Sequence, residues 1–262
     1  MTRYRLPEFD LEAGTKVIAD LHLDLGHPEG AKPLLEWIAR NPRMSGLVVL
    51  GDFFDVWIGP AQERMPGAPA LLDALRDLVA RGTRVDVVHG NRDFLLDASF
   101  EKRTGAKVHP FGFVARHDRA GSGDPRGRVV LIHGDELCKR DKAYQRLRAV
   151  LRSGPVRGIA PRLPLRFATY LAYSLRRTSA RAVDKNPSDT KSQQEAACRW
   201  WGASYQADAV VCGHAHRFRD MRLSSGPRWV VLDAFGGDRD VLTFGADGEL
   251  RISRSASPVA SA

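Results

Sequence analysis

The 262-residue sequence predicts an α/β domain in which short apolar strands alternate with amphipathic helices. Runs rich in Val, Leu and Ile recur along the chain, and the segments between them carry Leu at helical spacing. Five of the apolar runs stop on Asp, Asn or His. Open α/β sheets place their functional sites at the carboxyl ends of strands, so these endings also favour this fold class.

The first half of the chain supports the alternation element by element. The strands that we predict there are 16–19, 47–50, 85–88, 107–109, 112–117 and 129–132. The helices between them are 31–40, which has Pro33 in its first turn, and 69–81, which stops at Gly82. A polar loop at 119–128 should close a hairpin onto the strand at 129–132.

The pattern changes between residues 138 and 194, where strand patterns are lacking and prolines interrupt the chain. We interpret this segment as a basic helical cap inserted into a single domain of residues 1–262. A helix at 192–203 should lead back to a core strand that ends at Cys212. The last strands, 229–233, 241–245 and 249–253, should be antiparallel and complete a second sheet.

The composition is that of a globular protein, with 43% apolar and 27% charged residues. The N-terminal residues lead into a polar segment, and no run of about 18 apolar residues occurs, so we expect neither a secretory leader nor a membrane-spanning helix. Three cysteines without paired spacing favour a reducing compartment. We therefore expect a cytoplasmic protein, not a disulfide-rich secreted one.

Positive charge is concentrated in the predicted cap. Residues 139–185 contain thirteen Lys or Arg and two acidic residues, an excess larger than the net +9 of the whole chain. Such a surface indicates an anionic partner, either a phosphate-bearing substrate, a nucleic acid or an anionic membrane. Residues 163–175 mix apolar and aromatic side chains, with flanking Arg162, Arg166, Arg176 and Arg177, which fits a membrane-surface helix, a lipid clamp or a helix packed on its own domain.

The five strand endings supply seven side chains that commonly bind metals. They are Asp20, His22, Asp52, Asn91, His133, His214 and His216. Carboxylate and amide oxygens together with imidazoles suit Mn, Fe or Zn. Seven ligands exceed the needs of one ion, and pairs of ions about 3.5–4 Å apart are typical of phosphate-ester hydrolysis. The sequence therefore predicts a two-metal centre.

Four residues of this region are our candidates for catalysis. Asp52 follows Gly51 at a strand end, where one carboxylate can bridge two ions. Asn91 offers a neutral oxygen, and Arg92 beside it can hold a phosphoryl group through a two-pronged contact. With His214, Arg92 is expected to stabilise the charge that develops on the phosphoryl group.

The order of these motifs, Asp-x-His, Gly-Asp-x-x-Asp, Gly-Asn-x-Asp, His and Gly-His-x-His, resembles that of the calcineurin-like metallophosphoesterases. The resemblance implies a four-layer sandwich, two mixed sheets flanked by helices. It also implies two sets of ligands that share one carboxylate. The first set would be Asp20, His22, Asp52 and His216, and the second Asp52, Asn91, His133 and His214.

One branch of that family, the UDP-2,3-diacylglucosamine hydrolases of lipid A biosynthesis, is similar in further detail. Most of the family has His after the Asn, whereas this chain has Arg92, as that branch does. Residues 51–59 and 133–138 also resemble the branch, although 138–141 keeps only the last Asp of its pattern. The residues implied as substrate contacts are Asn91, Arg92, Asp141, Tyr144 and Arg148, with Ser179 and Lys185 nearby at a different spacing.

The resemblance implies hydrolysis of UDP-2,3-diacylglucosamine to UMP and 2,3-diacylglucosamine 1-phosphate, with manganese as the metal. It further implies that the cap receives acyl chains and that the protein is peripheral on the cytoplasmic face of the inner membrane. The alternatives are an enzyme for another nucleotide- or phosphate-bearing lipid, a broad phosphodiesterase or nuclease, and a scaffold without turnover. Aromatic residues of the cap stand among Leu and Ala rather than between arginines, which disfavours nucleic acid.

Overall fold

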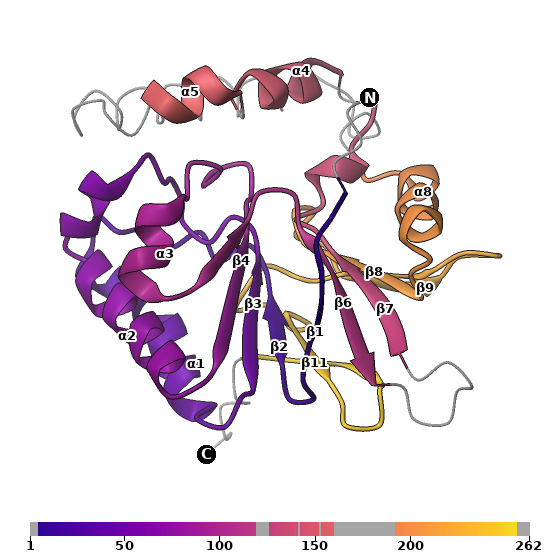
Figure 1. Cartoon of the computed structure of the whole chain (residues 1–262), viewed down its shortest axis with the longest axis horizontal. Helices are drawn as coiled ribbons and strands as arrows, with labels where there is room; N and C mark the ends of the chain where they lie inside the picture. Colours follow the sequence, from indigo (N-terminus) through magenta and orange to yellow (C-terminus); the bar gives the residue numbers. More distant parts are fainter. Residues whose placement is uncertain (1–4, 119–125, 141, 152, 160–191, 256–262) are drawn as a thin grey trace.

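The computed structural model describes residues 5–118, 126–140, 142–151, 153–159 and 192–255. Two six-stranded sheets pack face to face, and helices cover their outer faces (Figure 1). The four-layer α/β arrangement that the motifs predict is confirmed.

One sheet has the strand order β12-β11-β2-β3-β4-β5. Strands β2 to β5 are parallel, and β11 and β12 extend the sheet in antiparallel pairing. Their bounds are β2 (Lys16–Ile18), β3 (Gly46–Leu50), β4 (Arg84–Val88), β5 (Lys107–His109), β11 (Val241–Phe244) and β12 (Leu250–Ser253). All of these strands lie within a residue or two of their predicted positions.

The other sheet has the order β1-β6-β7-β8-β10-β9. Its strands are β1 (Glu8–Asp10), β6 (Phe113–Asp118), β7 (Arg126–Leu131), β8 (Ala209–Cys212), β9 (Arg219–Arg222) and β10 (Arg228–Val231). The strand predicted at 229–233 is confirmed as β10, but its predicted place beside β11 and β12 in the second sheet is wrong, because β10 lies in this sheet, parallel to β8. The unpredicted edge strand β9 pairs with β10 in an antiparallel hairpin and reverses the chain, which allows the parallel pairing.

Three apolar layers hold the elements together. The central layer lies between the two sheets and includes Val17, Leu50, Phe113 and Val211. Because central strands such as β3 are buried on both faces, they are apolar without alternation. Full burial of one such side chain contributes roughly 1.5–3 kcal/mol.

In the described part of the chain, four helices form the outer layers. The helices α1 (Lys32–Arg40), α2 (Ala68–Ala80) and α3 (Ala98–Thr104) pack on the sheet of β2 to β5. Helix α8 (Glu195–Tyr205) packs on the other sheet. Short 3-10 turns occur at η1 (Pro28–Ala31), η2 (Pro60–Arg64) and η3 (Asp135–Leu137). Helix α3 was not predicted, although Asp97 caps its first turn and Gly105 ends it in a left-handed conformation.

The predicted cap region begins with two helices, α4 (Lys142–Leu151) and α5 (Gly154–Ile159). Figure 1 shows them lying across the end of the sandwich at which β3 and β4 terminate. Residues 163–175, Asp141, Ser179 and Lys185 lie outside the described residues, so the cap boundaries at 138 and 194 stay a prediction. Among the described helices, none combines the length and apolar character needed to cross a bilayer.

Candidate metal centre

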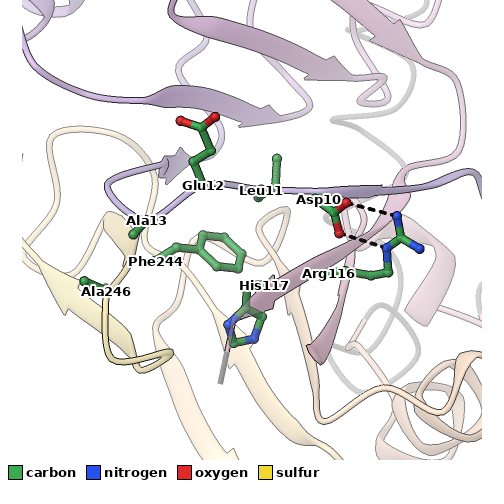
Figure 2. Close-up of a pocket in the computed structure, with 9 residues that line it drawn as sticks. Asp10, Leu11, Glu12, Ala13, Arg116, His117, Phe244 and Ala246 are labelled. Carbon is green, nitrogen blue, oxygen red and sulfur yellow. Dashed lines mark hydrogen bonds and ion pairs between the residues drawn. The ribbon is translucent and has the colours of Figure 1, made fainter. Parts of the chain in front are cut away.

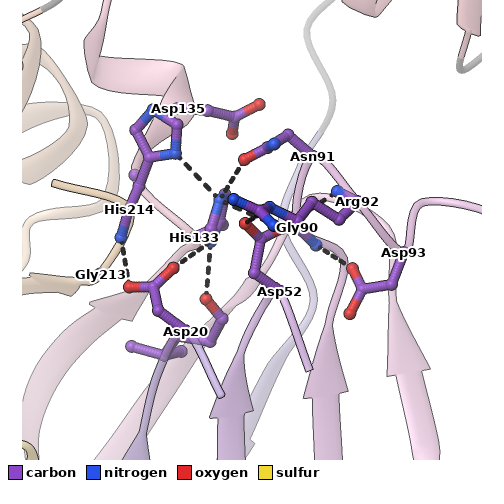
Figure 3. Close-up of polar contacts among 12 residues, drawn as sticks. Asp20, Asp52, Gly90, Asn91, Arg92, Asp93, His133, Asp135, Gly213 and His214 are labelled. Atoms are coloured by element: carbon purple, nitrogen blue, oxygen red, sulfur yellow. Dashed lines mark hydrogen bonds and ion pairs between the residues drawn. The ribbon is translucent and has the colours of Figure 1, made fainter. Parts of the chain in front are cut away.

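The carboxyl ends of five strands meet at the end of the sandwich beneath α4 and α5 (Figures 1 and 3). Strands β2, β3 and β4 of one sheet and β7 and β8 of the other lead directly into the predicted ligands. Three carboxylate or imidazole groups lie within 4.8 Å of one another in each of two clusters. These clusters are Asp20 with His22 and His216, and Asp20 with Asp52 and His133.

The first predicted ligand set is assembled around two imidazoles. His22 Nε2 and His216 Nε2 lie 3.1 Å apart. His216 Nε2 is 3.7 Å from Asp20 Oδ1, and His22 Nδ1 is 3.8 Å from Asp52 Oδ2. Metal–nitrogen bonds of about 2.0–2.1 Å bring two ligand atoms of one ion to roughly 3 Å from each other, so this spacing fits a cation between them.

The second predicted set surrounds His133. His133 Nε2 lies 3.1 Å from Asn91 Oδ1, 3.2 Å from His214 Nδ1 and 3.8 Å from Asp52 Oδ1. His133 Nδ1 is 2.8 Å from the carbonyl oxygen of Leu50 and therefore carries the ring hydrogen. When the ring is neutral, as a metal-binding histidine must be, this contact leaves the lone pair of Nε2 directed into the site.

Asp52 lies between the two sets, as the prediction of a bridging carboxylate requires. Its Oδ2 faces His22 and its Oδ1 faces His133. The backbone N–H of Arg92 donates to Oδ1 at 3.0 Å and holds the carboxylate in place.

Backbone strain is concentrated at the ligands. Among the described residues, seven that are not glycine have positive φ, and five of them are predicted ligands. These five are Asp20 (53°), His22 (49°), Asp52 (48°), His214 (69°) and His216 (48°). Asp and His tolerate the left-handed region better than most residues do, and strain of this kind gathers at functional sites.

Two glycines allow the ligand loops to approach one another closely. A Cβ on Gly90 would lie 2.1 Å from the backbone nitrogen of Asp52, and one on Gly213 would lie 2.3 Å from Asp20 Oδ2. Any side chain at either position would push a ligand carboxylate away. The glycines of the Gly-Asn and Gly-His motifs are therefore part of the site's geometry.

Burial and the carboxylates control protonation in the site. Burial raises the pKa of Asp52 to about 7. Burial also lowers the pKa of His133, but the carboxylates of Asp52 and Asp20 outweigh it and raise the pKa to about 9. Burial lowers the pKa of His22 to about 3 and that of His214 to about 4. The imidazoles of His22 and His214 are therefore neutral near pH 7, whereas the buried carboxylates favour a positive charge at His133.

Two buried atoms of the first set also point to a cation. Asp20 Oδ1 and His22 Nδ1 have no hydrogen-bond partner within the part of the chain that the structure describes. Leaving such atoms without a partner costs about 1–3 kcal/mol each in general. The donor set, its spacing and these unsatisfied atoms fit a pair of divalent cations.

Arg92 and Asp93 complete the edge of the site near Asp52. The guanidinium of Arg92 lies 3.4 Å from Asp52 Oδ2 and 2.7 Å from Asp55 Oδ1. Asp93 was not among the predicted residues, although it ends the Gly-Asn-Arg-Asp motif. Its carboxylate accepts hydrogen bonds of 2.7 Å from the backbone N–H groups of Gly90 and Phe53. Asp93 thereby ties the Asn91 loop to the Asp52 loop.

The predicted substrate contacts in the cap are placed only in part. Arg148 Nε lies 2.6 Å from Asp135 Oδ2, and the same guanidinium pairs with Glu136. Tyr144 lies on α4, but its side chain is outside the described part, as are Asp141, Ser179 and Lys185. Contact of any of these residues with substrate stays a prediction.

A hollow at the opposite end of the sandwich contains none of the predicted ligands (Figure 2). It has a volume of about 370 Å³ and lies beside the ends of β1, β6 and β11. An ion pair of 3.1 Å between Arg116 Nε and Asp10 Oδ1 forms part of its wall. The hollow and the predicted metal ligands therefore lie at different ends of the sandwich.

Comparison with known proteins agrees with this geometry. The family model of the calcineurin-like phosphoesterases matches residues 15–218. The chain belongs to this family. Membership confirms the prediction of a metal-dependent phosphoester hydrolase, and the predicted divalent metals agree with the ligand clusters described above.

Relatives of this family member carry a more specific name. A "UDP-2,3-diacylglucosamine hydrolase" of Ralstonia nicotianae is 34% identical over 226 residues, which cover 82% of each chain. A protein of the same name from Ectopseudomonas mendocina is 33% identical over 89% of this chain and 94% of its own. Among solved structures, a dimetal phosphatase from Danio rerio is similar at a TM-score of 0.47 and 14% identity, covering 93% of this chain and 96% of its own.

Proposed function

We propose that the protein hydrolyses the pyrophosphate bond of UDP-2,3-diacylglucosamine. Water adds to one phosphorus, the P–O bond to the other phosphate breaks, and the products are UMP and 2,3-diacylglucosamine 1-phosphate. The observation that carries the proposal is Arg92, which stands in place of the usual family histidine and reaches to 3.4 Å from Asp52 Oδ2. The relatives that carry the name UDP-2,3-diacylglucosamine hydrolase support the proposal.

The residues of the centre divide the chemistry between them. Two divalent ions held by the two ligand sets would lower the pKa of water and neutralise charge on the phosphoryl oxygens. Arg92 supplies a permanent positive charge for a pyrophosphate oxygen, and Asp55 holds its guanidinium in place. The imidazole of His214, whose Nδ1 lies 3.2 Å from His133 Nε2, would assist in stabilising the developing charge.

We further propose manganese as the metal and the 138–194 segment as the receptor for the acyl chains. Its thirteen basic residues between 139 and 185 would also attract the anionic cytoplasmic face of the inner membrane. Flotation with anionic vesicles in the absence of detergent tests this contact. Protein that floats equally with neutral vesicles, or remains at the bottom with both, would contradict it.

The decisive experiment measures UMP release from UDP-2,3-diacylglucosamine with added Mn²⁺ and with a chelator. Arg92→Met should lower kcat/KM by about 100-fold, since losing one group that stabilises developing charge typically costs that much. Arg116→Met, in the distant hollow, is the matched control and should leave the rate unchanged. Metal-dependent cleavage of an aryl phosphodiester without UMP release would refute this substrate and retain the phosphoesterase.

A further inference from the structure

Gln193 joins the two loops that carry the imidazoles of the second ligand set. Its side-chain Nε2 donates to the carbonyl oxygen of Gly213 at 2.9 Å and to that of Gly134 at 3.3 Å. Gly134 directly follows His133, and Gly213 directly precedes His214. The side chain of Gln193 is buried, with 9% of the residue exposed. One side-chain amide therefore donates hydrogen bonds to both loops.

The two loops have little freedom to move apart or together at this point. Gly213 N–H donates to the carbonyl oxygen of His133 at 2.8 Å. Gly134 has φ of 118°, and a Cβ there would lie 2.5 Å from Gln193 Nε2. The absence of a side chain at Gly134 thus makes room for the amide. One backbone hydrogen bond and the Gln193 amide together set the distance between the loops.

Gln193 also connects these loops to the cap segment. It lies near the end of residues 138–194, and the neighbouring backbone N–H of Gln194 donates to Leu137 O at 3.0 Å. At the beginning of the segment, Gln145 Nε2 donates to the carbonyl oxygen of Asp135 at 2.9 Å. Both ends of the segment therefore hold the stretch that follows His133.

We infer that Gln193 is a positioning residue for the second metal position. Its amide fixes the loops so that His133 Nε2 and His214 Nδ1 stay 3.2 Å apart, a spacing that suits two ligands of one ion. Ligands must be held within about 0.5 Å of their working geometry, so small loop shifts weaken binding. This inference rests on the two-metal centre of the proposed function, but not on its substrate.

The test compares Gln193→Met with Gln194→Met in the full-length protein. Methionine keeps the length of the side chain and removes the amide donors. Gln194 is the matched control, because its amide donates to the carbonyl oxygen of Ser192 in an exposed contact. Calorimetric titration of the metal-free proteins with Mn²⁺ should resolve two binding events. Electron paramagnetic resonance of bound Mn²⁺ gives an independent count.

Loss of hydrogen bonds that orient metal ligands generally weakens binding by about 10- to 100-fold. Because Gln193 acts through the residues next to the ligands, we expect Gln193→Met to weaken one of the two Mn²⁺ affinities by about tenfold. The other affinity should stay within twofold of the wild type, and Gln194→Met should change neither. Both affinities unchanged in Gln193→Met would overturn the inference. Equal weakening of both, together with easier unfolding in chelator, would show a general structural role and also overturn it.

Activity separates this inference from the proposed function. If the wild type binds two Mn²⁺ ions but releases no UMP, the proposed substrate fails, and the selective loss in Gln193→Met still supports the inference. If the wild type binds a single Mn²⁺, the second position does not exist and the inference fails. Where UMP is released, Gln193→Met should need more Mn²⁺ for half-maximal rate, with KM for the lipid within twofold.

Discussion

Replacing Arg148 of α4 tests how the beginning of the cap segment is attached to the residues that follow His133. Its guanidinium contacts two carboxylates, those of Asp135 and Glu136, of which 0% and 5% are exposed. Arg148→Met keeps the length of the side chain and leaves two buried acids without this cation. Breaking a buried ion pair generally costs about 3–5 kcal/mol. Since 16% of the Arg148 side chain is exposed, we expect the free energy of unfolding to fall by about 3 kcal/mol, the lower end of this range.

Thermal unfolding followed by circular dichroism measures this loss. For a chain of this size, about 3 kcal/mol lowers Tm by roughly 6 to 12 °C. The control is Arg251→Met, which breaks an exposed i,i+4 pair with Asp247 and should cost less than about 1 kcal/mol. Adding Asp135→Asn and Glu136→Gln to Arg148→Met should restore part of the loss. A Tm for Arg148→Met as high as that of Arg251→Met would refute the reasoning.

Three further predictions concern the centre and one buried carboxylate outside it. Asp52→Asn should abolish tight Mn²⁺ binding, measured by calorimetry, and lower the hydrolysis rate by at least about 100-fold, since the Asp52 carboxylate faces both ligand sets. Retention of both Mn²⁺ ions by this variant would contradict the prediction. Gly90→Ala should weaken Mn²⁺ binding with little effect on far-UV circular dichroism, because its Cβ would displace Asp52. Burial alone would raise the pKa of Asp86, but hydrogen bonds from His109 and Arg84 outweigh burial and hold the pKa below its ordinary value. Its stabilising contribution is therefore present above about pH 4 and is lost as the pH falls through the lowered pKa. In urea unfolding, Asp86→Asn should have a much lower free energy of unfolding than the wild type at pH 7, and the difference should shrink towards pH 3. A difference that stays constant with pH would contradict the assignment.

The sequence was sufficient for most of the fold because the central strands are buried on both faces. Strands such as β3 and β8 are continuous apolar runs with few alternative interpretations. The predicted metal ligands follow these runs directly, so predicting the strands also gave the candidate site. The helices α1 and α2 could be predicted for a similar reason, since each buries one stripe of Leu or Ile against the sheet.

Other features depend on contacts between residues far apart in the sequence, which the local sequence pattern does not predict. Strand β9 is exposed along its length and contains Arg and Asp, so nothing in its composition marks it as a strand. The direction of β10 follows from its pairing with β9 and could not be found without that strand. Gln193 was missed because a glutamine shows its role only when the two carbonyl groups it contacts are known.

The ligands of each predicted metal come from both sheets. Asp52 follows β3 in one sheet, whereas His133 and His216 follow β7 and β8 in the other. A bound ion would then cross-link the two sheets of the sandwich. This cross-link can form only after the two sheets have packed together. By mass action, free metal at 100 times its Kd adds about 2.7 kcal/mol to stability. Falling metal supply would therefore increase the unfolded fraction of the protein as well as stopping its reaction.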